Sequence, residues 1–335
     1  MPDKSPTENS ILQRILKRMT PSTNLTGQVV HLGIGDDAAL LRPTPGRESI
    51  LTCDWFLEGI HFFRDKHPPD AVGWKSLARA LSDVAAMGGL PRCFLLSLAL
   101  PESHTGRWLD AFLSGLQRAS HKFACTLAGG DTTRRRDILI NVTIVGEIRN
   151  THAVLRSGAR VGDILFVTGR LGEAELGLRL LKRGKTQPRS SSPFLRKHLY
   201  PEPRLAAGQW LAKRHLATSM MDLSDGLSID LPRLCAASGV GAEVESEKLP
   251  VVQHSSAIRG LGVDSLQLAL HGGDDYELLF TVRSSQLKLL PKTFHGVPLT
   301  AIGKITKRRD QILLRQAGRE RQLHPGGWDP FRNKA

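Results

Sequence analysis

Six short stretches of this 335-residue chain place an aspartate beside glycine, serine, threonine or cysteine. They are Gly33 to Ala39, Cys53-Asp54, Ser82-Asp83, Gly129 to Thr133, Asp222 to Gly226 and Gly272 to Asp275. The first stretch presents two adjacent carboxylates, which repel each other unless water separates them or a cation neutralises them. Glycine beside an acid lets backbone N–H groups and an ion approach closely. We interpret the six stretches as one site for divalent cations and phosphate.

Magnesium suits such a site because it is a hard cation that prefers oxygen ligands. It keeps several waters and is held by one or two carboxylates together with substrate phosphates. Phosphoryl transfer requires mainly positioning and charge neutralisation, so no covalent nucleophile is expected. The usual nucleotide motifs are absent: Gly184-Lys185-Thr186 resembles the end of a P-loop, but Arg179 stands where its first glycine belongs. Phosphate chemistry here therefore depends on metal ions held by carboxylates.

Each stretch also has a structural explanation that needs no ligand. Adjacent acids occur in turns, Asp225 could cap a helix, and Asp83 could be a solvated helix residue. His61 and Trp328 could serve packing alone. The combination favours function, because a chain with excess positive charge has gathered many of its acids at Gly-rich, strand-end positions.

The apolar pattern places these acids on alternating strands and helices. In the first half we expect strands over 49–53, 92–100, 124–128 and 137–148, and helices over 11–19, 71–88 and 105–122. In the second half we expect strands over 164–168, 240–245, 276–282, 298–302 and 311–315, and helices over 172–183, 203–216 and 226–237. Asp131 then follows the end of a strand. This order predicts an α/β fold of two domains, residues 1–150 and 151–335.

The composition limits the classes of partner. The chain has 46 basic and 32 acidic residues, a net charge of +14, which favours polyanions in general. Its basic runs are short and scattered and its aromatic residues few, so solvated basic faces are favoured over a nucleic-acid groove. Four cysteines without paired spacing indicate neither a disulfide framework nor a zinc site. A polar N-terminus and the lack of any span-length apolar run predict a cytoplasmic protein with no membrane partner.

The motifs together carry a specific resemblance, in order from about residue 30 to residue 331. They are Gly33-Ile-Gly-Asp-Asp-Ala-Ala39, Asp54 with Glu58-Gly-Ile-His61-Phe62, Leu81-Ser-Asp-Val-Ala-Ala-Met-Gly88, Gly129-Gly-Asp-Thr-Thr133, Asp222-Leu-Ser-Asp-Gly-Leu227 and Gly272-Gly-Asp-Asp-Tyr-Glu-Leu278. This set resembles the thiamine-monophosphate kinase family, which phosphorylates thiamine monophosphate to thiamine diphosphate with ATP. The resemblance implies a PurM-like architecture, in which an N-terminal α/β domain forms a homodimer through its sheet and a C-terminal α/β domain follows. It also implies several magnesium ions and direct in-line transfer.

The resemblance also assigns roles to individual residues. The implied metal ligands are Asp37, Thr52, Cys53, Asp54, Asp83, Asp131, Asp222 and Asp225. The implied ATP contacts are Gly130, Asp131, Arg156 and Ser224, and the implied substrate contacts are His61, Asp274 and Trp328. No residue is assigned as general base, because the attacking phosphate oxygen of the substrate is already anionic. Of the first acid pair, Asp37 rather than Asp36 is placed on metal.

Two positions depart from the family pattern. Cys53 stands where the family usually has threonine, and a thiol is a poor magnesium ligand, so that contact is lost or made through backbone or water. Asp274 stands where the family has glutamate and is one methylene shorter. We therefore expect a looser or water-mediated substrate contact at Asp274.

Other functions remain open at this point. The nearest are other PurM-like enzymes that use ATP. Selenophosphate synthetases carry a reactive cysteine or selenocysteine near the N-terminus, whereas the first cysteine here, Cys53, falls in an expected core strand. The hydrogenase-maturation relative ends in a functional cysteine, whereas this chain ends in Ala335, and aminoimidazole ribotide synthetase shares the fold more than these motifs. A basic nucleic-acid-binding protein is suggested by charge alone.

Overall fold

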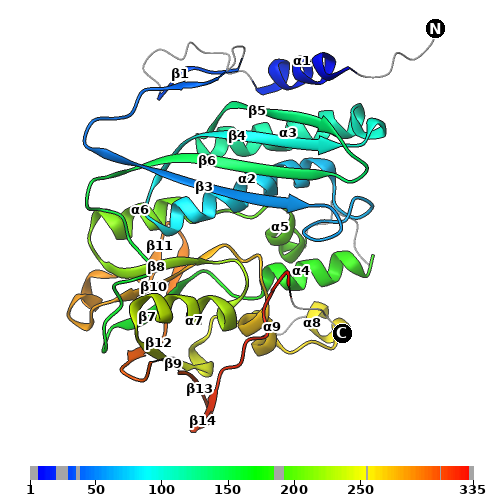
Figure 1. The fold of residues 1–335 in the computed structure, drawn as a ribbon. Coiled ribbons are helices and arrows are strands. Elements are labelled where there is room, and N and C mark those ends of the chain that lie inside the picture. The colour runs from blue at the N-terminus through cyan, green and yellow to red at the C-terminus, as the bar shows by residue number, and fades with distance from the viewer. Residues whose placement is uncertain are drawn as a thin grey trace. The chain divides into compact units, whose positions relative to one another are not determined.

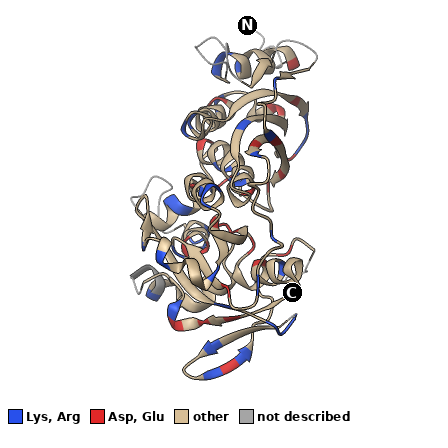
Figure 2. Ribbon diagram, turned by 90° about the vertical axis from the view of Figure 1, so that its left-hand side faces the viewer, with Lys and Arg blue, Asp and Glu red and all other residues tan. Residues whose placement is uncertain are grey.

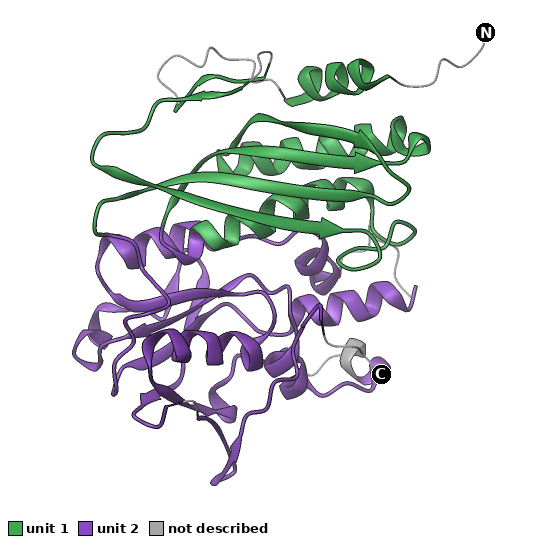
Figure 3. Cartoon of the chain, in the orientation of Figure 1, with its two compact units in different colours: residues 1–84, 89–151 green, residues 85–88, 152–335 purple. Residues whose placement is uncertain are grey.

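The computed structural model describes residues 7–19, 29–34, 38–184, 192–253, 256–309 and 311–331. The chain forms two compact units (Figure 3). Unit 1 consists of Met1–Val84 and Gly89–Thr151, and unit 2 of Ala85–Gly88 and His152–Ala335.

Unit 1 is built on a four-stranded sheet in the order β3-β6-β4-β5 (Figure 1). Its elements are α1 (Glu8–Met19), β1 (Val30–Leu32), β2 (Leu40–Leu41), β3 (Arg47–Leu57), α2 (Pro69–Ala86), β4 (Leu90–Leu100), η1 (Glu102–His104), α3 (Arg107–Phe123), β5 (Thr126–Arg134) and β6 (Leu139–Arg149). Strands β4 and β5 are parallel, and β6 is antiparallel to both β3 and β4. The sheet thus has β3 at one edge and β5 at the other.

The two faces of this sheet differ in what covers them. Helices α2 and α3 lie against one face (Figure 1), which buries Phe56 and Phe94. We call this the inner face. On the other, outer face, the exposed fractions are 71% for Leu51, 54% for Trp55 and 38% for Leu95. Side chains alternate between the two faces because successive residues of a strand point in opposite directions.

Unit 2 is built on an eight-stranded sheet in the order β14-β13-β9-β12-β7-β10-β8, with β11 paired to β12. Its strands are β7 (Ile164–Thr168), β8 (Ala217–Leu223), β9 (Gly241–Glu245), β10 (Glu277–Val282), β11 (Thr293–Phe294), β12 (Val297–Thr306), β13 (Ile312–Gln316) and β14 (Arg319–Gln322). Its helices are α4 (Glu173–Lys182), α5 (Pro193–Leu199), α6 (Leu205–Lys213), α7 (Leu227–Ser238), η2 (Ser246–Lys248), α8 (Ser256–Leu261), α9 (Ser265–His271) and η3 (Ser284–Leu289). Only β9 and β13 pair in parallel among these described strands.

Helices cover both faces of the sheet of unit 2, and strand β10 shows how. Leu279 packs in a core with Leu231 of α7, whereas Leu278 and Phe280 pack in a second core with Leu211 of α6. The predicted α/β fold class is confirmed. Every residue of β10 is buried, as a strand between two helical layers requires.

Two expectations about local structure were wrong, and one helix was not expected. The strand expected over 124–128 does not end at Gly129-Gly130-Asp131; β5 continues to Arg134, paired with β4 along its length around one irregularity. Cys53 is exposed rather than in a core, because β3 is an edge strand and Cys53 points to the outer face. Helix α5 was not expected, because its seven residues follow a Ser- and Pro-rich stretch typical of a loop.

Basic residues occur throughout both units, on helices, strands and loops (Figure 2). On the β13–β14 hairpin, for example, Arg315 is paired with Glu320 rather than left in an unbroken basic stripe. This pattern agrees with solvated basic faces. Within the described ranges, no helix has both the length and the apolar character needed to cross a membrane.

Candidate functional site

Two oxygen-bearing side chains meet on the inner face of unit 1. The hydroxyl of Thr52 on β3 donates a 2.5 Å hydrogen bond to Asp83 Oδ2 in the last turn of α2. A carboxylate there faces the negative end of the helix dipole, so helix stability does not explain Asp83. Asp54 lies two positions after Thr52 and therefore on the same face of β3. We call Thr52, Asp54 and Asp83 the inner acid cluster.

Arg79 compensates the charge of this cluster. It lies one helical turn before Asp83, and its Nε is 3.3 Å from Asp54 Oδ2 and its Nη2 is 3.4 Å from Asp54 Oδ1. Its guanidinium also lies over the ring of Phe56, 5.3 Å from the centroid. Thr52 and Asp54, two residues apart on β3, thus contact Asp83 and Arg79, four residues apart on α2. Sequence reasoning did not find Arg79, although its i, i+4 spacing to Asp83 was visible.

Cys53 and Asp131 belong to the opposite face of the same sheet. The register pairs Trp55 with Asn141, Asn141 with Ser97, and Ser97 with Asp131, so Asp131 lies on the outer face with Trp55 and Cys53. Strands β3 and β5 are the two edges, separated by β6 and β4. Three strand spacings correspond to about 14 Å. Within one unit, Asp131 is therefore too far from β3 to share an ion with it.

The neighbouring Gly130 explains how β5 can pair so closely with β4. A Cβ atom at this position would lie 1.9 Å from the backbone oxygen of Leu96. Only glycine permits that approach. The glycine therefore serves the strand pairing as well as any nucleotide contact.

His61 has a defined tautomer in the loop after β3. The Leu57 backbone N–H donates to His61 Nδ1 at 3.0 Å, so the neutral ring carries its proton on Nε2. The loop is anchored by Glu58, whose Oε2 accepts the Ile138 N–H at 2.8 Å and pairs with Arg64. Nε2 is thus the donor nitrogen of the neutral His61 ring.

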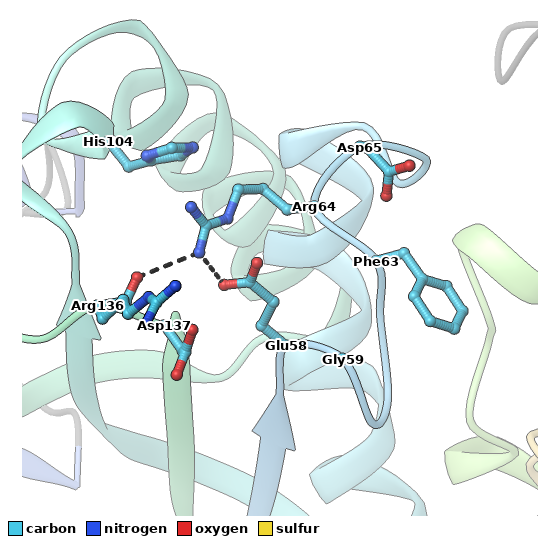
Figure 4. A pocket seen from close by; sticks show the side chains of 8 residues that line it. All are labelled: Glu58, Gly59, Phe63, Arg64, Asp65, His104, Arg136 and Asp137. Atoms are coloured by element: carbon cyan, nitrogen blue, oxygen red, sulfur yellow. Dashed lines mark hydrogen bonds and ion pairs between the residues drawn. The ribbon is translucent and has the colours of Figure 1, made fainter.

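A pocket of about 650 Å³ lies beside this loop (Figure 4). Its lining residues are Glu58, Gly59, Phe63, Arg64, Asp65, His104, Arg136 and Asp137. Arg64 reaches between His104 and Glu58, and its Nη2 also donates to the Arg136 carbonyl at 3.3 Å. Burial by itself raises the pKa of Glu58, but its hydrogen bonds from Arg64 and Ile138 outweigh this and hold the pKa below its usual range. Sequence reasoning did not find this pocket, because three separate segments form it.

In unit 2, four predicted residues from three distant segments come together. The Asp274 N–H donates to the Ser224 carbonyl at 2.8 Å, and the Trp328 N–H donates to the Asp225 carbonyl at 2.9 Å. The backbones approach so closely that a Cβ at Gly327 would lie 2.1 Å from Asp225 O. We call Ser224, Asp225, Asp274 and Trp328 the unit 2 cluster.

Asp230 in the first turn of α7 holds the loop of this cluster. Its Oδ2 accepts the backbone N–H groups of Ser224 at 3.1 Å and Asp225 at 3.0 Å, and its Oδ1 pairs with Arg233. Arg233 pairs with the Asp225 side chain too, at 2.5 Å. Burial, reinforced by the charge of Asp225, raises the pKa of Asp230 to about 7. Asp222, the next-to-last residue of β8, is also buried.

The loop carrying Asp274 has an unusual backbone. Asp274 and Tyr276 have φ angles of 67° and 50°, and a positive φ is a clear outlier for a bulky residue such as tyrosine. The Tyr276 hydroxyl donates to Asp274 Oδ1 at 2.6 Å, and the buried His198 Nδ1 lies 3.7 Å from Asp274 Oδ2. Asp274 therefore has a fixed carboxylate.

The side chains of Asp275, in this loop, and Glu277, the first residue of β10, are anchored in the core of unit 2. Asp275 accepts the N–H groups of Gly172 at 2.6 Å and Ala174 at 3.2 Å, at the start of α4. Burial raises the pKa of Asp275 to about 7. Glu277 pairs with Lys197 and Arg204, which hold its pKa below the usual range although burial alone would raise it.

Arg156 does not join the unit 2 cluster. Its carbonyl accepts the Ser238 hydroxyl at 2.9 Å, at the C-terminal end of α7. Ser224 precedes the other end of this helix, and twelve residues span about 18 Å. Asp37 lies outside the described residues.

The donor atoms of both units are compatible with magnesium. Among the described residues, no three His, Cys, Asp or Glu side chains lie close enough to hold a metal ion. Magnesium does not need such a cage, because it takes one or two carboxylates and completes its shell with waters and phosphates. The Thr52 hydroxyl beside the Asp83 carboxylate is a hard oxygen pair of this kind. The thiol of Cys53 is not.

Comparisons with known proteins cover nearly the whole chain. The family model described as AIR synthase related protein, N-terminal domain, matches residues 35–148, and the corresponding C-terminal domain matches residues 160–315. A thiamine-monophosphate kinase of Bacillus subtilis (strain 168) is 34% identical over 95% of this chain and 98% of its own length. One of Aquifex aeolicus (strain VF5) is 39% identical over 89% of this chain and 92% of its own.

Solved structures agree. A crystal structure of thiamine-monophosphate kinase from Stenotrophomonas maltophilia K279a matches with a TM-score of 0.79 and 36% identity, covering 92% of this chain and 96% of that one. A structure described as AaThiL complexed with AMPPCP and TMP matches with a TM-score of 0.74 and 34% identity, covering 99% of both chains. Hydrogenase maturation protein HypE in complex with ATP, at 18% identity and a TM-score of 0.77, shares the fold.

Proposed function

Because this chain belongs to the thiamine-monophosphate kinase family, we propose that acids and hydroxyls of its two units bind magnesium, ATP and thiamine monophosphate. The chain is an ATP-dependent kinase that converts thiamine monophosphate to thiamine diphosphate, with the PurM-like two-domain fold. We place this activity in the cytoplasm, where a biosynthetic kinase meets its substrates.

One observation carries the assignment of the site: the unit 2 cluster unites residues predicted for three different roles. Ser224 was predicted for ATP, Asp225 for metal, and Asp274 and Trp328 for substrate. Two backbone hydrogen bonds, of 2.8 and 2.9 Å, join segments that lie about 50 and 100 positions apart. Chance turns would not converge in this way. The Trp328 ring is proposed to stack on a thiamine ring.

The inner acid cluster is the proposed magnesium position of unit 1. Thr52, Asp54 and Asp83 would hold the ion, and bound magnesium would neutralise phosphate charge during transfer. Asp222 and Asp225 are the proposed ligands in unit 2. Arg156 offers a guanidinium that can clamp a phosphate through two parallel hydrogen bonds. No side chain needs to remove a proton, because the acceptor oxygen of the substrate phosphate is anionic near neutral pH.

We also propose a homodimer, because unit 1 separates two sets of predicted ligands. Asp131 lies on β5, whereas the other described ligands of unit 1, Thr52, Cys53, Asp54 and Asp83, lie on or near β3 at the opposite edge of the sheet. A second copy packed on the outer face would bring its Asp131 and Gly130 to the outer side of the other subunit's β3, the side on which Cys53 lies. The exposed apolar side chains Leu51, Trp55 and Leu95 on that face support this interface.

Turnover with ATP, magnesium and thiamine monophosphate, read as thiamine diphosphate formed, tests the function. Asp83→Asn is expected to raise the magnesium concentration for half-maximal turnover by about tenfold or more. Asp110→Asn is the control, because Asp110 is an exposed acid paired with Arg14 on the surface. Equal magnesium dependence in both variants would refute the inner acid cluster as a metal site.

Mixing two variants, at a magnesium concentration at which each alone is inactive, tests the homodimer. If Asp131 acts across the interface, random pairing of Asp83→Asn and Asp131→Asn subunits restores about a quarter of wild-type activity, since half of the dimers carry one intact site. If both residues act within one subunit, the mixture stays inactive.

A further inference from the structure

The strained loop of unit 2 is maintained against a conformational cost. Sparsely populated φ/ψ conformations of non-glycine residues persist only where the surroundings enforce them, and they concentrate at functional sites. Here Asp274 and Tyr276 both have positive φ, although a glycine at either position would adopt it without strain. The anchors around them are sufficient to enforce this shape.

These anchors are of two kinds. The backbone N–H groups of Asp274 and Tyr276 donate to the Ser224 and Leu223 carbonyls, at 2.8 and 2.9 Å. The side chain of Asp275, between them, is held by the start of α4. The backbone from Asp274 to Tyr276 is therefore held in one conformation.

This backbone conformation places the hydroxyl of Tyr276 next to the carboxylate of Asp274. The tyrosine is 2% exposed, and its O–H donates to Asp274 Oδ1 at 2.6 Å. The buried His198 faces the other oxygen, Oδ2, at 3.7 Å. Asp274 itself is partly exposed, so its side chain reaches the surface of unit 2 while its orientation is fixed from inside.

We propose that Tyr276 is a positioning residue that orients the Asp274 carboxylate for thiamine monophosphate, with His198 as a second support. This inference rests on the proposed role of Asp274 in substrate binding. Asp274 has a shorter side chain than the family's glutamate, so it has less reach and depends more on orientation. The tyrosine does not touch the substrate in this account; it acts through Asp274.

Tyr276→Phe removes only the hydroxyl and tests the proposal. We expect KM for thiamine monophosphate to rise about tenfold, the effect of one hydrogen bond to a charged group. We expect kcat and KM for ATP to change less than about twofold, because the hydroxyl acts on substrate binding alone. In an Asp274→Ala background, Tyr276→Phe should have no further effect on KM, because residues acting through one contact are not additive.

Thr218→Val is the matched control. It removes another hydroxyl-to-carboxylate hydrogen bond of unit 2, the 2.7 Å bond from Thr218 to Asp163, at the opposite end of β8 from the loop. It should lower the thermal midpoint while leaving KM for thiamine monophosphate unchanged. Three results would each overturn this inference and leave the proposed function standing. They are a wild-type KM for thiamine monophosphate in Tyr276→Phe, an equal rise in its KM for ATP, and additive effects of Tyr276→Phe and Asp274→Ala on KM. A wild-type chain that does not phosphorylate thiamine monophosphate would overturn the proposed function and this inference with it.

Discussion

Replacing Glu277 by glutamine should strongly destabilise unit 2. The Glu277 side chain is fully buried and accepts hydrogen bonds from Arg204 Nε at 2.6 Å, Arg204 Nη2 at 2.5 Å, Lys197 Nζ at 2.5 Å and Thr168 Oγ1 at 2.6 Å. Glutamine keeps the shape but turns an N–H group toward these donors and leaves two largely buried cations without a counter-charge. Breaking a buried pair in this way costs about 3–5 kcal/mol.

The expected loss of unfolding free energy is large enough to measure by urea unfolding. With a urea m-value of about 2 kcal/mol/M, the loss corresponds to a midpoint lowered by about 2 M. Urea unfolding followed by circular dichroism measures it. Glu320→Gln is the control, since Glu320 makes a similar two-point pair with Arg315, but on the surface, where such pairs contribute little. If Glu277→Gln and Glu320→Gln unfold at the same urea concentration, the reasoning from burial is refuted.

Three further results are expected. Because the folded-state pKa of Asp275 is raised to about 7, its protonated form stabilises the folded state at low pH, and this contribution is lost as pH rises through 7. Relative to Asp275→Asn, the free energy of unfolding of the wild type, measured in urea, should rise by about 2 kcal/mol from pH 8.5 to pH 5.5. A difference between the two proteins that does not change with pH would contradict the raised pKa. Gly130→Ala should lower the urea midpoint far more than Gly129→Ala, because the new Cβ meets backbone at 1.9 Å in the first case and the movable Leu95 side chain at 3.3 Å in the second; equal midpoints would exclude the close approach. Cys53→Thr should lower the magnesium concentration for half-maximal turnover without changing the thermal midpoint, because it places a hard oxygen on the outer face of β3, the face on which the proposed second copy packs with its Asp131; an unchanged requirement would argue against a metal contact at this position.

The sequence predicted the fold class and most elements because apolar periodicity survives in a chain whose sheets are covered by helices. It did not predict the extent of β5. Gly129-Gly130-Asp131 looks like a turn in isolation, and only the pairing with β4 reveals a strand that needs glycine for a close approach. A short element such as α5 carries too few residues for a periodic signal.

The candidate site, like the fold, was predicted from the sequence only in part. Acids beside glycines were visible, and in unit 2 four of the predicted residues converge, whereas Arg156 lies at the other end of α7. The supporting residues Arg79, Asp230 and His198 were not visible, because what marks them is burial and hydrogen bonding rather than a motif. The faces on which Thr52, Cys53 and Asp54 lie were available from alternation along β3, but the order of strands was not. That Asp54 and Asp131 lie at opposite edges therefore emerges only from the fold.

The strand order of unit 2 has a consequence for how the chain folds as it is made. Among the described strands, β7 pairs with β10 and β12 alone, and 109 positions separate Thr168 from Glu277. At a synthesis rate of about 5–20 residues per second, the apolar strand β7 waits roughly 5–20 seconds for its first partner. Until then its backbone and its Leu165 and Val167 side chains have no sheet to enter. Strand β7, an interior strand of the unit 2 sheet, therefore needs protection from aggregation while the chain is made.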